Sequence, residues 1–155
     1  MKKYLIDTFQ FNDEANKKLL AKIRLLPDQA ECSKLFSHLI NCQYKWLMRI
    51  KEDGKAQQMS WWDPLYSLDQ MEEKWEDSVR GWITYIGSVS EEALNEEITF
   101  KGVDGDRYAV TPLDIALQLN YHSIHHRAQM QMIIRKQNVE PDAVDYIRGR
   151  SRKLS

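Results

Sequence analysis

The chain has 155 residues, of which 43% are hydrophobic and 29% charged, and its formal net charge is -1. This length predicts a single domain over residues 1–155, and the composition argues against intrinsic disorder and against a nucleic-acid-binding protein. No apolar run is long enough for a signal peptide or a membrane span, so we expect a cytoplasmic protein without membrane contact.

The first predicted helix covers residues 4–26. Its apolar residues recur at helical spacing until Pro27 interrupts the pattern: Ile6, Phe9, Leu19, Leu20, Ile23 and Leu26. Asn16 falls on this apolar face, where a buried amide needs a hydrogen-bond partner. We therefore expect Asn16 to make a hydrogen bond within the core.

The second predicted helix starts after Asp28 as N-cap and runs to about Glu52. Its inward side combines apolar residues with His38 and Cys42. The basic residues Lys45, Arg49 and Lys51 are placed on its other faces. Cys32 and Cys42 lie ten positions apart on this helix, a separation of about 15 Å that rules out a disulfide between them. The lack of a disulfide between these cysteines agrees with a reducing compartment.

A long connection over residues 53–66 contains Trp61 and Trp62, which are candidates for a lid, a dimer contact or ordinary packing. Ser67 then caps a third helix whose inward residues extend to Ile86. A short helical turn follows at residues 90–92. Two strand-like runs around residues 104–106 predict a small β-hairpin before the last long helix.

The fourth long helix is predicted from the N-cap Thr111 to about Gln137, with Pro112 at its first position. Its inward stripe includes His122 and His126, where a bundle helix ordinarily carries leucine. Arg127 lies on a neighbouring face, and we favour a salt-bridged surface arginine over a carboxylate-binding one. After this helix we expect a loop, one helical turn packed through Val144 and Ile147, and a basic, solvated tail.

These elements predict an all-α fold, a four-helix bundle with a small β-hairpin between helices 3 and 4, and bundle cores commonly hold metals between facing helices. His122 and His126, four residues apart, can reach one ion, and His38 supplies a third imidazole. Three histidines and an open position are typical of catalytic zinc sites. The alternative is that the histidines only pack in the core. The HExxH pattern and the inward glutamates of di-iron bundles are absent from these stretches.

Four stretches carry a family resemblance: FNDEANKKLL, FSHLINCQYKWL, HSIHHRAQ and EPDAVDYI. Together they resemble the DinB-like (DinB/YfiT) family of four-helix-bundle metalloproteins. The resemblance implies up-down-down-up topology and one divalent metal ion, commonly nickel or zinc, held by His38, His122 and His126. Relatives in the wider superfamily are thiol-dependent enzymes, including transferases that add a low-molecular-weight thiol such as bacillithiol to electrophiles.

Our leading hypothesis is therefore a metal-dependent thiol S-transferase whose partners are a small-molecule electrophile and a thiol. The alternative is a non-catalytic metal-binding or dimeric stress-response protein, and a metal-dependent hydrolase comes third because no inward carboxylate is available as general base. Cys42 lies one turn after His38. We favour it as a small packing residue over a fourth metal ligand, which would close the site.

Overall fold

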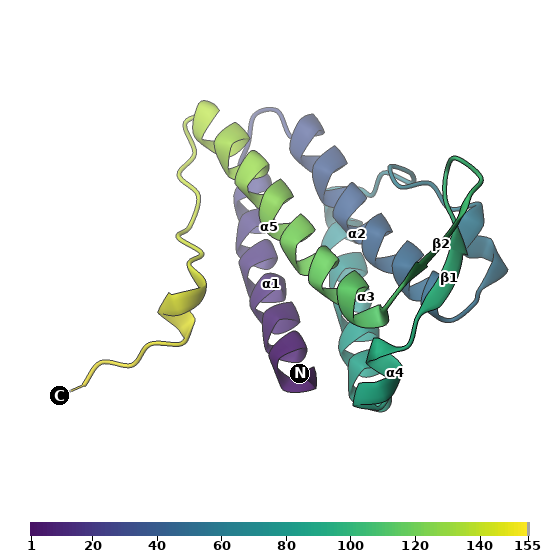
Figure 1. Ribbon diagram of the computed structural model, residues 1–155. Helices are drawn as coiled ribbons and strands as arrows, with labels where there is room; N and C mark the ends of the chain where they lie inside the picture. Colours follow the sequence, from purple (N-terminus) through teal and green to yellow (C-terminus); the bar gives the residue numbers. More distant parts are fainter. Residues whose placement is uncertain (155) are drawn as a thin grey trace.

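Four long helices, α1 (Lys2–Ile23), α2 (Ala30–Ile50), α3 (Leu68–Ser88) and α5 (Pro112–Lys136), form a bundle in the computed structural model (Figure 1). The structure describes residues 1–154, apart from the side chain of Arg148. Helices α1 and α2 each contact both α3 and α5. Helices α1 and α2, although consecutive in the sequence, therefore lie diagonally across the bundle.

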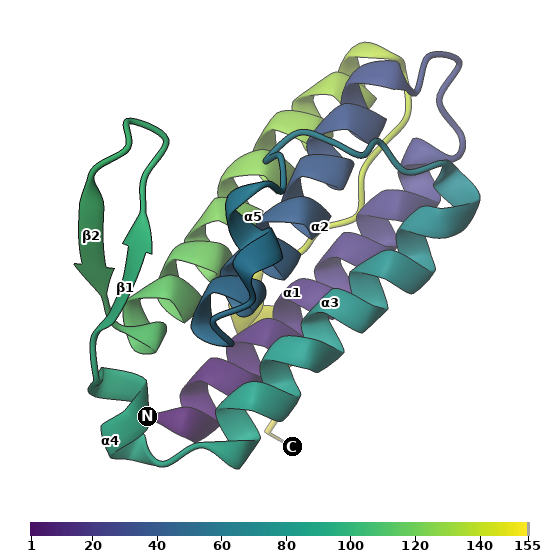
Figure 2. The same ribbon diagram turned by 90° about the vertical axis from the view of Figure 1, so that its right-hand side faces the viewer.

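The topology is up-down-down-up. Figures 1 and 2 show that α1 and α5 run in one direction, whereas α2 and α3 run in the other. Helices α2 and α3 are therefore parallel neighbours, and the chain must travel the full length of the bundle between them. This requirement explains the long connection, and the predicted fold class is confirmed.

Local capping signals set the helix starts. Ser67 forms a capping box with Gln70 at the start of α3, and the Thr111 side chain accepts a hydrogen bond from the Asp114 backbone at the start of α5. The predicted end of α1 and the predicted start of α2 are each wrong by a few residues. Helix α1 ends at Ile23 instead of residue 26, and α2 starts at Ala30, whose backbone donates to the Asp28 carboxylate.

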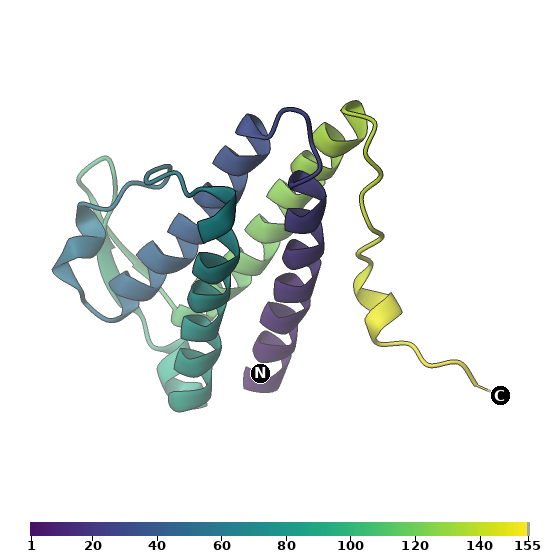
Figure 3. The ribbon, with the colours of Figure 1, turned by 180° about the vertical axis from the view of Figure 1, so that it is seen from behind.

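The connection between α2 and α3 is held against α2 by side-chain hydrogen bonds. It begins with a short 3₁₀ helix, η1 (Gly54–Gln57). The Asn41 side chain donates to the Pro64 carbonyl, the Ser37 hydroxyl accepts from the Tyr66 backbone, and Lys45 donates to the Met59 carbonyl. Figure 3 shows this segment crossing from the lower end of α2 to the upper end of α3. It covers a face of α2 that would otherwise be exposed to solvent.

The predicted hairpin is present. It follows the short helix α4 (Glu91–Asn95) and pairs β1 (Ile98–Lys101) with β2 (Arg107–Val110) in antiparallel register. Gly105 in its turn has a φ of 91°, a conformation that side chains rarely adopt. The Phe100 ring of β1 packs edge-on against Trp46 of α2 with centroids 5.1 Å apart. The hairpin is thus attached to the same face of α2 as the connection.

After α5 the chain runs back beside α1 (Figures 1 and 3), through a second 3₁₀ helix, η2 (Tyr146–Gly149). The prediction that Ile147 packs is wrong, because this side chain is 68% exposed. Tyr146 makes the contact instead, edge-on against Phe11 of α1. The backbone turn of η2 presents Tyr146 to the bundle.

Large aromatic and aliphatic side chains fill the space between the four helices. Phe9 stacks on Trp82 across α1 and α3, and Phe36 meets Trp75 across α2 and α3. These four rings are almost fully buried. In the described part of the chain, no helix carries an apolar stretch long enough to cross a bilayer.

A polar network joins α1 to α5 inside this core. Asn16 is fully buried and donates to Ser123, as its position on the apolar face predicted. Arg127 donates to the side-chain oxygens of Asn12 at 2.8 Å and Asn16 at 3.1 Å. The prediction of a surface salt bridge at Arg127 is wrong, because this residue is only 4% exposed. Burial lowers its pKa to about 10.

We predict that Asn16→Ala lowers the free energy of unfolding by about 2 to 4 kcal/mol, because it removes one of the two side-chain acceptors of a buried guanidinium. Urea unfolding monitored by circular dichroism measures this. Asn95→Ala is the control, since its exposed side chain should contribute less than about 0.5 kcal/mol. Equal effects of the two substitutions would contradict the prediction.

Candidate metal centre

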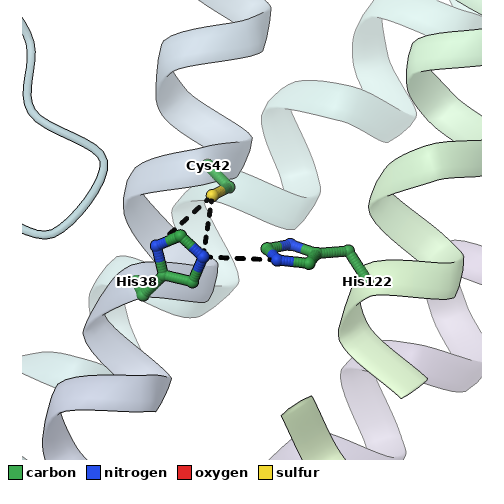
Figure 4. Close-up of side chains that lie close together, drawn as sticks. All are labelled: His38, Cys42 and His122. Carbon is green, nitrogen blue, oxygen red and sulfur yellow. Dashed lines mark hydrogen bonds between the residues drawn. The ribbon is translucent and has the colours of Figure 1, made fainter. Parts of the chain in front are cut away.

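The histidines from two antiparallel helices meet at the middle of the bundle. His38 comes from α2, and His122 and His126 come from α5. His38 and His126 are buried and His122 is half-buried, whereas His125 is exposed on the outer side of α5. Figure 4 shows the His38 and His122 side chains pointing toward each other from facing helices.

The Nε2 atoms of the three imidazoles are close together. His122 Nε2 lies 3.2 Å from His38 Nε2 and 2.9 Å from His126 Nε2. The three rings are nearly perpendicular to one another, with interplanar angles of 82°, 87° and 78°. His122 is thus the central member of the set.

Hydrogen bonds at the opposite ring nitrogens fix the protons of two of these rings. His38 Nδ1 donates to the Trp61 carbonyl at 2.8 Å, and His126 Nδ1 donates to Gln129 Oε1 at 2.7 Å. A neutral imidazole carries one proton, so the Nε2 atoms of His38 and His126 present lone pairs. Partners of this kind typically orient metal-binding histidines.

The environment keeps the three imidazoles neutral. Burial is the main cause that lowers the pKa of His38, His122 and His126, and the neighbouring histidines lower it further at His122 and His126. The pKa of His122 falls to about 4. Neutral imidazole is the form that binds a metal ion.

This arrangement fits a divalent cation. Lone pairs that face each other repel, and the one proton of His122 cannot bridge both of its neighbours with good geometry. Nitrogen ligands at about 2.0–2.1 Å from one ion lie about 2.9 to 3.4 Å apart, which includes both contacts of His122 Nε2. Each of the two contacts of His122 Nε2 thus has the spacing of two ligands of one ion. The group whose ligand atoms all lie within 4.8 Å of one another comprises His38, Cys42 and His122, and His126 is not part of it.

Cys42 is buried in the hydrophobic core, as expected of a packing residue, and it also lies beside the histidines. The ligand atoms of His38, Cys42 and His122 all lie within 4.8 Å of one another and could hold a metal ion. Cys42 Sγ lies against the His38 ring, 3.6 Å from Nε2 and 3.7 Å from Nδ1 (Figure 4). Burial raises the pKa of this thiol to about 12.

Two tryptophans of the connection surround His38. Trp62 stacks on the His38 ring with centroids 3.8 Å apart, and Trp62 itself is 41% exposed. The Trp61 carbonyl accepts the His38 proton, and its ring packs near Trp46. Of the readings open for these residues, packing against the cluster is the one the contacts support.

The hydrophobic pattern of α2 gave no sign that two cations are buried below the histidines. Lys45 is 4% exposed and Arg49 is 9% exposed, although the sequence placed both outside the apolar face. The face that carries them is covered by the connection and the hairpin. A helical wheel reports the angle of a residue but gives no information about an irregular segment that covers it.

Comparison with known families gives one match. The model of the DinB superfamily matches residues 27–130, which include α2, α3, the hairpin and α5 as far as Met130. This range is about two thirds of the chain and contains the four side chains of the cluster. A search of curated proteins finds no match.

We predict that both cysteines of the metal-free protein resist iodoacetamide at pH 8. They are free and buried, and burial raises the pKa of Cys32 to about 11 and of Cys42 to about 12. At pH 8 both groups are therefore protonated, whereas the thiolate is the reactive form. Mass spectrometry should show no carbamidomethylation of the native chain and two modifications after unfolding in urea. Rapid modification of native Cys42 alone would contradict the prediction.

Proposed function

Because the chain belongs to the DinB superfamily, we propose that it is a metal-dependent enzyme of the thiol S-transferase type. In this proposal, one divalent ion, nickel or zinc, is held by the Nε2 atoms of His38, His122 and His126. The convergence of these atoms, with the Nδ1 protons of His38 and His126 already committed elsewhere, is the observation that supports the proposal most directly.

A divalent ion at this place would supply Lewis acidity, which lowers the pKa of a thiol. The chain's own residues orient the imidazoles. The Trp61 carbonyl and Gln129 each hold a histidine proton away from the ion, and Trp62 covers one side of His38. These contacts fix the orientation of the two imidazoles and shield one face of His38 from water.

The residues around the cluster favour an external thiol over hydrolysis. Cys42 is a buried, protonated thiol, and the described cluster contains no aspartate or glutamate that could act as general base. A metal ion also lowers the pKa of bound water, but the later proton transfers of hydrolysis ordinarily use a general base. A thiol ionises more readily than water and supplies the nucleophile itself, so a small thiol and an electrophile are the proposed partners.

A second candidate is a metal-binding module without turnover. The position of Cys42 Sγ, 3.6 Å from His38 Nε2 and buried, favours it because a fourth protein ligand closes a tetrahedral site. In that case the protein would bind zinc tightly and leave no position for a thiol. A dimeric stress-response protein would belong to this class.

We predict about one equivalent of metal per chain in untagged protein purified without chelator, measured by elemental analysis. His38→Ala and His122→Ala should lose this metal, because the two imidazoles that remain in each variant seldom hold an ion tightly. His125→Ala is the matched control and should retain it, since the exposed His125 makes only a ring contact with His126. A well-folded parent that binds neither added nickel nor added zinc would sink the proposal.

We further predict that metal-loaded protein accelerates the reaction of bacillithiol with monochlorobimane, and that Cys42→Ala retains both metal and activity. Fluorescence of the bimane adduct measures the rate, and chelator-treated protein gives the background.

The absorption spectrum of cobalt-substituted protein distinguishes the enzyme from the closed metal-binding module. A sulfur-to-cobalt charge-transfer band that Cys42→Ala abolishes, together with background rates, would instead establish the closed module.

A further inference from the structure

Lys45 and Arg49 are buried cations that form no ion pair with any residue the structure describes. Each makes one hydrogen bond to a carbonyl: Lys45 to Met59, and Arg49 Nη2 to Lys101 at a long 3.4 Å. Neither has an ion-pair partner among the described residues. Arg49 Nε is fully buried and has no hydrogen-bond partner. Buried charges are ordinarily paired, so this pair leaves binding capacity unused.

Aromatic rings hold the guanidinium of Arg49 in place. Its Cζ lies 4.6 Å from the Trp46 ring centroid, 5.1 Å from that of Trp61 and 4.4 Å from that of Phe100. Lys45 Nζ lies 4.5 Å from the Trp61 ring centroid. Cation–π contacts fix a cation without neutralising its charge. The guanidinium is therefore oriented but still lacks an anion.

Arg49 borders a cavity between α2, the connection and the hairpin. This cavity has a volume of about 310 Å³ and is lined by Trp46, Arg49, Trp61, Phe100, Val103 and Tyr108, among others. Its size and its aromatic walls are those of a small-molecule site with one charged group. A second cavity of about 190 Å³ meets Arg49 from the side of η1.

We propose that this cavity binds the carboxylate of a small organic molecule, with Arg49 as the main donor and Lys45 adding positive potential from behind the Trp61 ring. A guanidinium matches a carboxylate through two parallel hydrogen bonds. Arg49 and Asp104 are the charged residues that line this cavity, and the nearby negative charge of Asp104 disfavours a doubly charged phosphate relative to a singly charged carboxylate. The aromatic walls favour a ligand with an apolar body.

The carboxylate site adjoins the histidine cluster through Trp61. The carbonyl of this residue accepts the His38 proton, and its ring contacts Lys45 and Arg49. The site itself uses no metal ligand. Its test is therefore independent of the proposed enzyme activity and is done on metal-free protein.

The experiment uses the side-chain Nε–H signal of Arg49 in ¹⁵N-labelled, chelator-treated full-length chain, assigned by its absence from the Arg49→Lys spectrum. Benzoate is the probe, benzyl alcohol the neutral control, and inorganic phosphate the competing anion. We expect a saturable shift of this signal with benzoate and none with benzyl alcohol. The Nε–H signal of Arg127, an equally buried arginine elsewhere, should not move.

Two further variants test the charge contributions. Lys45→Met should weaken benzoate binding about tenfold, whereas Lys45→Arg, which keeps the charge, should restore it. Arg127→Lys should bind benzoate like the parent. The absence of a saturable shift in the folded parent would overturn the proposal without any variant. Tighter binding of phosphate than of benzoate, or equal binding of benzyl alcohol, would overturn it as well.

Discussion

The hydrogen bond from His38 Nδ1 to the Trp61 carbonyl is the contact that joins the histidine cluster to the connection between α2 and α3. On one side it fixes the proton of His38, so that Nε2 presents a lone pair to His122. On the other side it holds the connection against α2 and thereby places both tryptophans. Trp62 then stacks on the His38 ring, and Trp61 extends toward Lys45 and Arg49. One residue, Trp61, therefore links the histidine cluster to the cavity beside Arg49.

The two buried arginines, Arg127 and Arg49, differ in their hydrogen-bond partners. Arg127 donates hydrogen bonds to two side-chain amide oxygens of α1, and this network joins the first and last long helices of the bundle. Arg49 receives only a long contact to a carbonyl and keeps an unpaired Nε. Both lack a carboxylate among the described residues. The first arrangement is complete and serves packing, whereas the second is incomplete in the way that a ligand site is.

Much of the fold could be predicted from the sequence, because four stretches have a helical period and Ser67 and Thr111 are strong caps. The convergence of His38 with His122 also follows from that period, since both fall on inward stripes. The period could not show that an irregular segment covers a second face of α2. For that reason the burial of Lys45 and Arg49, which the pattern places outside the inward face, could not be predicted. The closeness of Cys42 to the histidines depends on rotamers, which a helical wheel does not specify.

The contact between His38 and His122 also bears on the stability of the folded chain. The two residues are 84 positions apart and belong to different helices. An ion held by both would close a loop of that length, as a covalent cross-link does, and an unfolded chain offers no preformed site for it. Occupancy would then raise the free energy of unfolding by mass action. The bound ion would act as a reversible cross-link between α2 and α5, and its presence would depend on the supply of metal.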